Sequence, residues 1–117
     1  MEQEKLCQTY LLAAAEKVRS AGLARGVLRD DSGRVCMLGA MMYCGVHCDI
    51  SKERIYEHIV SILPPRPEGS AGGDDFNSEV EEYPQRSPSF HIAWWSNMRA
   101  KDAEEVARMF EVAALTC

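Results

Sequence analysis

The segment Asp30–Ala40 constrains the fold of this chain more than any other stretch. A turn of acidic, hydroxyl and glycine residues, Asp30-Asp31-Ser32-Gly33, runs directly into the most apolar run of the sequence. Turn residues of this kind set where a chain reverses, and an apolar run must be buried. We therefore expect this segment to mark the centre of one compact core, with the turn at its edge.

Length and charge limit the possible classes of protein. The chain has 117 residues and 46% hydrophobic content, which suits a single domain, residues 1–117, with a real core. A net charge of −5 makes nucleic-acid or membrane-surface binding unfavourable. The longest apolar run, residues 35–46, is shorter than the roughly 20 residues that span a bilayer, and Met1–Lys5 lacks a signal pattern. We predict a cytoplasmic protein.

The cysteine count points to the same compartment. An odd number of cysteines fits a secreted disulfide framework poorly. In a reducing compartment we expect free thiols, which behave as small apolar residues when they are buried. The five cysteines are Cys7, Cys36, Cys44, Cys48 and Cys117.

Apolar spacings of three and four predict two helices in the first part of the chain. The first covers residues 4–20 and is stopped by Gly22. The second is buried and covers residues 37–44. Its centre, Gly39-Ala40, has almost no side chain, so another element can approach closely, and we expect that element to be the last helix.

Three further helices have recognisable ends. Ser51 is a good N-cap for the third, which Pro64-Pro65 terminates. Residues 88–96 fit a short helix better than a strand. Asp102 caps the last helix, and Glu105 completes an Asp variant of the capping box.

Residues 25–36 have the pattern of a β-hairpin, with Asp30–Gly33 as its turn. A two-stranded ribbon is marginally stable alone, so helices must cover one of its faces. The predicted fold class is therefore α+β and mainly helical. Four or five helices pack around the short hairpin, and a long acidic loop leaves the domain at residues 65–88.

The acidic loop and a tryptophan pair are the candidate interaction surfaces. Residues 65–88 hold six carboxylates against two arginines, are rich in proline and glycine, and favour a mobile loop. The loop could occupy a basic partner surface, or it is a solvated linker. Trp94-Trp95 could expose one ring as a binding hot spot, or both rings could cap the core edge. The candidate acidic residues are Asp74, Asp75, Glu79, Glu81 and Glu82.

Two residue sets could carry chemistry. Cys36 is expected near a helix N-terminus, where a thiol pKa can fall, and His91 is the candidate base for such a nucleophile. The apolar neighbours of Cys36 favour a buried, inert thiol instead. Cys44, His47 and Cys48 are possible zinc ligands, but they are crowded at one helix end and lack a second paired knuckle. We expect no metal and no cofactor.

Several stretches match, in order, the pattern of a known family. They are residues 11–15, 22–26, 30–33, 36–41, 95–97 and 101–106. Together they resemble an uncharacterised family of small proteins of actinobacteria and their phages, with Cys-x-Leu-Gly-Ala, Trp-Asn-Asp and Arg-Thr-x-Glu-Glu-Val motifs. The resemblance carries no established activity. Arg25 stands where that family has glutamine, and Ser96-Asn97 stands where it has Asn-Asp. The lost carboxylate favours a structural role, in capping and fastening the last helix.

The leading hypothesis is a non-enzymatic protein-interaction module, such as a phage accessory or host-directed protein, with a protein partner of unknown identity. The first alternative is a small cysteine-dependent enzyme that uses Cys36 and His91. The second is a zinc-stabilised adaptor that uses Cys44, His47 and Cys48. A homo-oligomer is compatible with each of these readings.

Overall fold

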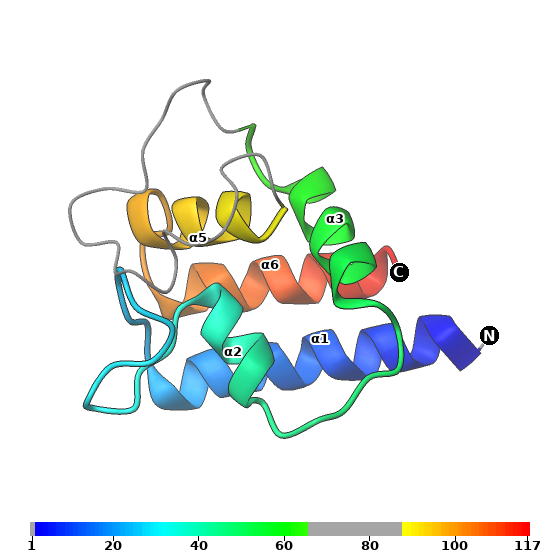
Figure 1. Cartoon of the computed structure of the whole chain (residues 1–117), viewed down its shortest axis with the longest axis horizontal. Coiled ribbons are helices and arrows are strands. Elements are labelled where there is room, and N and C mark those ends of the chain that lie inside the picture. The colour runs from blue at the N-terminus through cyan, green and yellow to red at the C-terminus, as the bar shows by residue number, and fades with distance from the viewer. Residues whose placement is uncertain (1, 66–87) are drawn as a thin grey trace.

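Helices account for the regular structure of residues 2–65 and 88–117, the part of the chain that the computed structural model describes. α1 and α6 run antiparallel side by side (Figure 1). α2 packs on α1 and α5, and α3 packs on α5 and α6. None of the helices described is long and apolar enough to cross a membrane. The helices are α1 Glu2–Ala21, α2 Met37–Tyr43, α3 Lys52–Ile62, α5 Pro88–Met98 and α6 Ala103–Leu115.

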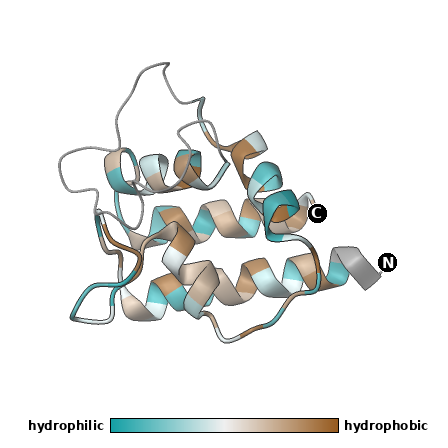
Figure 2. Cartoon of the chain, viewed as in Figure 1, coloured by the Kyte–Doolittle hydropathy of each residue, from teal (hydrophilic) through white to brown (hydrophobic). Residues whose placement is uncertain are grey.

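Every described helix contributes to one hydrophobic core. Hydrophobic and hydrophilic residues alternate along α1 and α6, as expected for helices with one buried face (Figure 2). Residues 35–40 are all buried, which confirms that this run lies in the core. The largest fully buried side chains are Leu11, Val18, Val35, Met37, Leu38, Met41, Ile55, Ile59, Ile92, Val106 and Phe110.

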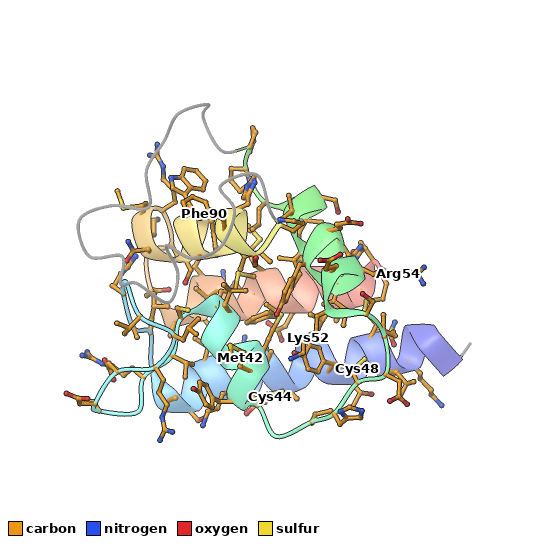
Figure 3. All side chains as sticks on the ribbon, viewed as in Figure 1. Met42, Cys44, Cys48, Lys52, Arg54 and Phe90 are labelled. Atoms are coloured by element: carbon orange, nitrogen blue, oxygen red, sulfur yellow. A yellow bond between two sulfur atoms is a disulfide. The ribbon has the colours of Figure 1, made fainter. Side chains whose placement is uncertain are left out.

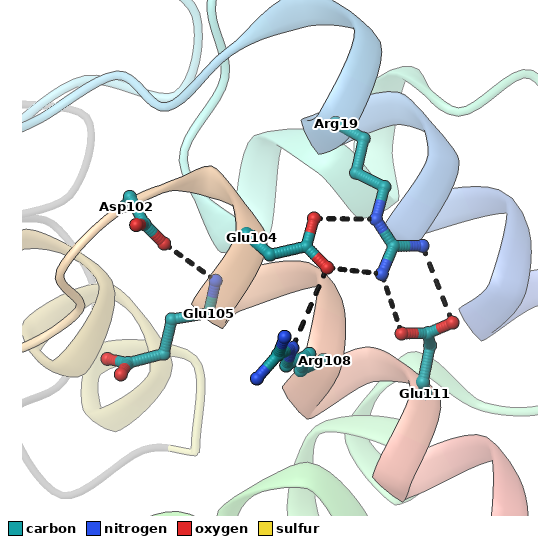
Figure 4. Close-up of polar contacts among 6 residues, drawn as sticks. All are labelled: Arg19, Asp102, Glu104, Glu105, Arg108 and Glu111. Carbon is teal, nitrogen blue, oxygen red and sulfur yellow. Dashed lines mark hydrogen bonds and ion pairs between the residues drawn. The ribbon is translucent and has the colours of Figure 1, made fainter.

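The predicted N-cap positions of α3 and α6 are confirmed, and one of the two side chains makes the capping hydrogen bond. Asp102 Oδ1 accepts a hydrogen bond from the Glu105 N–H at 2.9 Å (Figure 4). The Glu105 carboxylate accepts from the N–H of Lys101, one residue before the cap, at 3.1 Å. Ser51 occupies the N-cap of α3, but its side chain makes no capping hydrogen bond. Local sequence therefore identified where both helices begin.

The predicted α+β class and its hairpin over residues 25–36 are wrong. The described residues contain two isolated β-bridges, Leu23–Val35 and Arg29–Val35, and no strand. Residues 25–28 are bent, and Gly26 has a φ of 77°, outside the range of extended backbone. A bent segment cannot form consecutive β-sheet hydrogen bonds. The backbone pairing is therefore limited to one residue before the bend, Leu23, and one after it, Arg29.

The predicted turn is present without its strands. The Gly33 N–H donates to the Asp30 carbonyl at 3.0 Å. The Asp30 carboxylate accepts from the backbone N–H groups of Ser32 at 3.0 Å and Arg34 at 2.9 Å, and from Arg34 Nε at 2.7 Å. A single carboxylate thus organises the whole reversal.

We expect Asp30→Asn to make the fold less sensitive to acid. Burial raises the pKa of Asp30, but hydrogen bonds from Arg34 and Ser32 outweigh it and hold the pKa below its ordinary value. A carboxyl group of this kind stabilises the fold above its unfolded pKa, near 4, and stops doing so as the pH falls through the folded pKa. The stability difference between wild type and Asp30→Asn should therefore be constant above pH ~5 and shrink below pH ~4.

Urea denaturation at a series of pH values measures this difference. Asp31→Asn, at the exposed neighbouring position, is the matched control. Parallel pH profiles for wild type, Asp30→Asn and Asp31→Asn would show that the Asp30 hydrogen bonds do not contribute to acid stability.

Gly39 lies against a loop backbone and not against the last helix, which corrects the expected partner. A Cβ built at Gly39 would lie 1.9 Å from the Leu28 carbonyl oxygen. The same carbonyl accepts from the Cys36 N–H at 3.2 Å. The absent side chain of Gly39 therefore lets the bent segment dock on the first turn of α2.

Arg25 and Ser96 link α5 to the rest of the fold. The guanidinium of Arg25 donates to the carbonyls of Ser96 at 3.2 Å, Asn97 at 3.1 Å and Lys101 at 3.1 Å. These carbonyls lie at and beyond the C-terminal end of α5, where a positive charge is favourable. Ser96 is fully buried, and its Oγ accepts from the Met37 N–H at 3.0 Å. Ser96 thus fastens α2, and not the last helix as expected.

Polar and covalent links tie α1 to α6. Arg19 pairs with Glu104 at 2.9 Å and with Glu111 at 2.7 Å (Figure 4). Hydrogen bonds from Arg19 lower the pKa of Glu104. Cys7 and Cys117 form a disulfide with their Cα atoms 6.4 Å apart. The expectation of free thiols is therefore wrong for this pair, because the antiparallel helices bring residues from opposite ends of the sequence together.

Candidate functional site

Cys36 is built into the core as a helix cap. It is 4% exposed, and its Sγ accepts from the Gly39 N–H at 3.4 Å at the start of α2. Burial raises the pKa of the Cys36 thiol, and this effect exceeds the opposing effect of nearby backbone N–H groups. A nucleophilic cysteine needs a thiolate and access for a substrate. The geometry therefore gives Cys36 the environment of a structural thiol.

His91 has partners of its own on another face of α5. Its Nε2 hydrogen-bonds the Pro64 carbonyl at 2.8 Å, and its ring meets Trp94 edge-on at 5.7 Å. Ser96, which contacts the start of α2 beside Cys36, lies five residues further along α5. Five residues correspond to about 140° around a helix. His91 and the side of α5 that meets Cys36 therefore point in different directions.

Two of the three candidate zinc ligands have hydrogen-bond partners of their own, and the third, Cys48, is half-buried. Cys44 Sγ lies 3.4 Å from the Met41 carbonyl and 3.8 Å from the Val46 carbonyl. His47 is exposed and bonds Asp49 at 2.9 Å. Across residues 2–65 and 88–117, no three His, Cys, Asp or Glu side chains gather closely enough to hold a metal ion. The geometry offers no support for a zinc site there.

Trp94 and Trp95 line a cleft of about 420 Å³ between the end of α3, α5 and α6. Both rings are buried, with 4% and 3% of their area exposed, so the alternative in which one ring is exposed is wrong. Only the edges of the two rings face the cleft. We call this site the aromatic cleft. Its remaining lining residues are Pro64, Pro65, Arg99, Glu105 and Met109.

The mouth of the aromatic cleft combines a cation with apolar walls. Arg99 is exposed, and its guanidinium lies 5.8 Å from the centre of the Trp94 ring. Met109 is half-buried on α6, and Pro64 and Pro65 follow α3. Tryptophan and arginine are the residues most enriched at binding hot spots. The mouth of the cleft therefore places one cation beside apolar side chains.

Sequence reasoning identified the tryptophans but missed the other lining residues. Arg99 follows Trp95 by four residues and was detectable as a cation beside an aromatic pair. Met109 and Pro64 come from helices and turns far apart in the sequence. Nothing in a single sequence shows that such segments meet.

The five acidic candidates lie in residues 66–87, outside the described part of the chain. They are Asp74, Asp75, Glu79, Glu81 and Glu82. The predicted mobile loop over residues 65–88 falls there as well, apart from its end residues, Pro65 and Pro88. Pro65 lines the aromatic cleft, so in sequence the acidic stretch begins directly after that site.

Comparison with known proteins identifies a family. A family model described as a family of unknown function, DUF6197, matches residues 3–116. No curated protein matches the chain, and no solved structure matches it. Because the match spans nearly all of the 117 residues, the chain belongs to the family of unknown function DUF6197.

Proposed function

We propose that this chain is a non-enzymatic protein-interaction module that binds a partner at the aromatic cleft. The carrying observation is the cleft itself, in which two tryptophans of α5, Arg99 just after α5, and Met109 of α6 converge. A phage accessory or host-directed protein would use such a surface to engage a host protein. The partner would insert one apolar anchor side chain between the tryptophan edges and Met109.

The size and chemistry of the cleft support this proposal. A volume of about 420 Å³ accommodates a large side chain and its neighbouring backbone. Aromatic residues, methionine and arginine are enriched at protein interfaces, and an arginine at the rim adds directional hydrogen bonds. Glu105 already accepts a backbone hydrogen bond from Lys101, so Arg99 is the charged group better placed to meet a partner.

The burial of Cys36 counts against the alternative of a cysteine-dependent enzyme. The Cys36 sulfur accepts the capping hydrogen bond at the start of α2, and the His91 imidazole is hydrogen-bonded to the Pro64 carbonyl. A hydrolase of the Cys–His type needs the two groups within hydrogen-bond reach of each other and of a substrate. The proposed role requires neither group to react.

We expect Met109→Lys to abolish partner capture. A lysine at this position places a charge on the apolar wall of the cleft, where a partner's anchor would have to desolvate it. The measurement is affinity capture from the native host with tagged protein, quantified by mass spectrometry. Leu12→Lys is the matched control, because Leu12 is 47% exposed on α1 and does not line the cleft.

The outcomes separate the cleft from the acidic stretch. A partner retained by wild type and Leu12→Lys but lost by Met109→Lys supports the aromatic cleft. Identical sets of captured proteins for Met109→Lys and wild type would refute it. Deletion of residues 68–82 tests whether the acidic residues extend the surface, and unchanged capture by that variant would limit the interface to the cleft.

A further inference from the structure

A second cavity, of about 380 Å³, lies between α1, the end of α2 and the start of α3. Tyr10, Met41 and Ile55 are buried and form its floor. Met42 and Lys52 are exposed at its rim, where Figure 3 shows them near each other. This volume falls within the range of small-molecule sites in proteins. The cavity is separate from the aromatic cleft, with which it shares no lining residue.

The floor of this cavity is apolar and neutral. The Tyr10 hydroxyl donates to the Met41 carbonyl at 2.9 Å, so its one polar atom is already used. Burial raises the pKa of Tyr10, which keeps the phenol uncharged at physiological pH. Methionine side chains are flexible and polarisable, and they adapt to ligands of different shape. Met41 and Met42 therefore provide an adjustable wall for a hydrocarbon group.

The residues that line the cavity include one lysine and no carboxylate, and the neighbouring Asp49 carboxylate is paired with His47. Lys52 is the permanently charged side chain among the lining residues. His47 also lines the cavity, but its imidazole bonds Asp49 at 2.9 Å. In a chain of net charge −5, a cavity whose lining holds an ammonium group and no acid is electrostatically selective. The Lys52 ammonium would repel a cationic ligand and attract an anionic one.

We propose that this cavity binds a small amphipathic carboxylate. Its hydrocarbon tail packs among Met41, Met42 and Ile55, and its carboxylate lies at the Lys52 ammonium. The site is an addition to the proposed interaction at the aromatic cleft and does not depend on it.

Methyl NMR of methionine-labelled protein tests this assignment with three probes that share a ten-carbon chain. Decanoate, 1-decanol and decyltrimethylammonium carry negative, neutral and positive head groups, respectively. We expect saturable shifts of the Met41 and Met42 methyl signals, with decanoate bound most tightly and decyltrimethylammonium least. The Met109 methyl, in the aromatic cleft, should not move.

Charge variants test the role of Lys52. Lys52→Gln should weaken decanoate binding about threefold to fivefold, the effect typical of one exposed ion pair, and leave 1-decanol binding unchanged. Lys101→Gln removes the same charge from an exposed position that does not line the cavity, and it should change neither affinity.

Three results would overturn the proposal. Equal affinity for decanoate and 1-decanol would remove the carboxylate from the assignment, as would an unchanged decanoate affinity in Lys52→Gln. Shifts centred on the Met109 methyl would place the probe in the aromatic cleft. A failure of partner capture in Met109→Lys has no bearing on these readouts, so the two proposals can fail separately.

Discussion

Gly39→Ala is expected to destabilise the fold by about 3 kcal/mol or more, although the same change in most helices is stabilising. The added Cβ would lie 1.9 Å from the Leu28 carbonyl oxygen and 2.8 Å from its carbonyl carbon. These are backbone atoms, so no side-chain rotation relieves the overlap. The bent segment must move away from α2, and the hydrogen bond from the Cys36 N–H to Leu28 is then lost. Urea denaturation monitored by circular dichroism measures the change.

Gly33→Ala is the matched control for this variant. Gly33 has a φ of 86°, and a Cβ there would meet no atom within 4 Å. Its expected cost is the backbone strain of a left-handed residue alone, about 1 kcal/mol. If Gly39→Ala were as stable as wild type, the close packing of residue 28 on α2 would be contradicted. If Gly33→Ala cost as much as Gly39→Ala, backbone strain and not overlap would explain both.

Local chemistry made most helix boundaries predictable. Asp102 accepts the Glu105 N–H as its spacing indicated, and α3 ends before Pro64-Pro65. A cap or a proline acts on its own neighbours, so a short window of sequence contains the whole interaction. The hairpin prediction was wrong because the turn signal at Asp30–Gly33 is equally local and says nothing about the flanking segments. Residues 25–28 are bent where they pack on α2. This is a tertiary contact that the local sequence does not contain.

The contacts that define the sites join distant segments. Arg25 reaches α5 across 71 or more residues, and Cys7 is separated from Cys117 by 110. The aromatic cleft likewise needs the end of α3 to meet α5 and α6. The odd number of cysteines led to the prediction of free thiols. That number contains no information on which cysteines lie close together in the fold. For Cys36 the apolar neighbours did suffice, since burial of an apolar run also buries the thiol within it.

Removal of the Cys7–Cys117 disulfide is expected to lower the free energy of unfolding by about 3 kcal/mol and Tm by roughly 10 °C. The cross-link closes nearly the whole chain, and a loop of this length restricts the unfolded state strongly. The native state keeps other ties at this end, since His58 Nε2 bonds the Ala113 carbonyl and the Thr116 hydroxyl, both at 2.9 Å. The variant should therefore fold, with lower stability. Denaturation of wild type with and without reductant, beside the double variant Cys7→Ser/Cys117→Ser, measures the effect.

Cys44→Ser controls for the loss of a thiol as such, because Cys44 is free and half-buried. Its stability should still respond to reductant, whereas that of the double variant should not. Thiol counting on the denatured protein gives the independent check: three reactive thiols without reductant, from Cys36, Cys44 and Cys48, and five with it. Five thiols in both conditions, with no change in Tm, would contradict the disulfide.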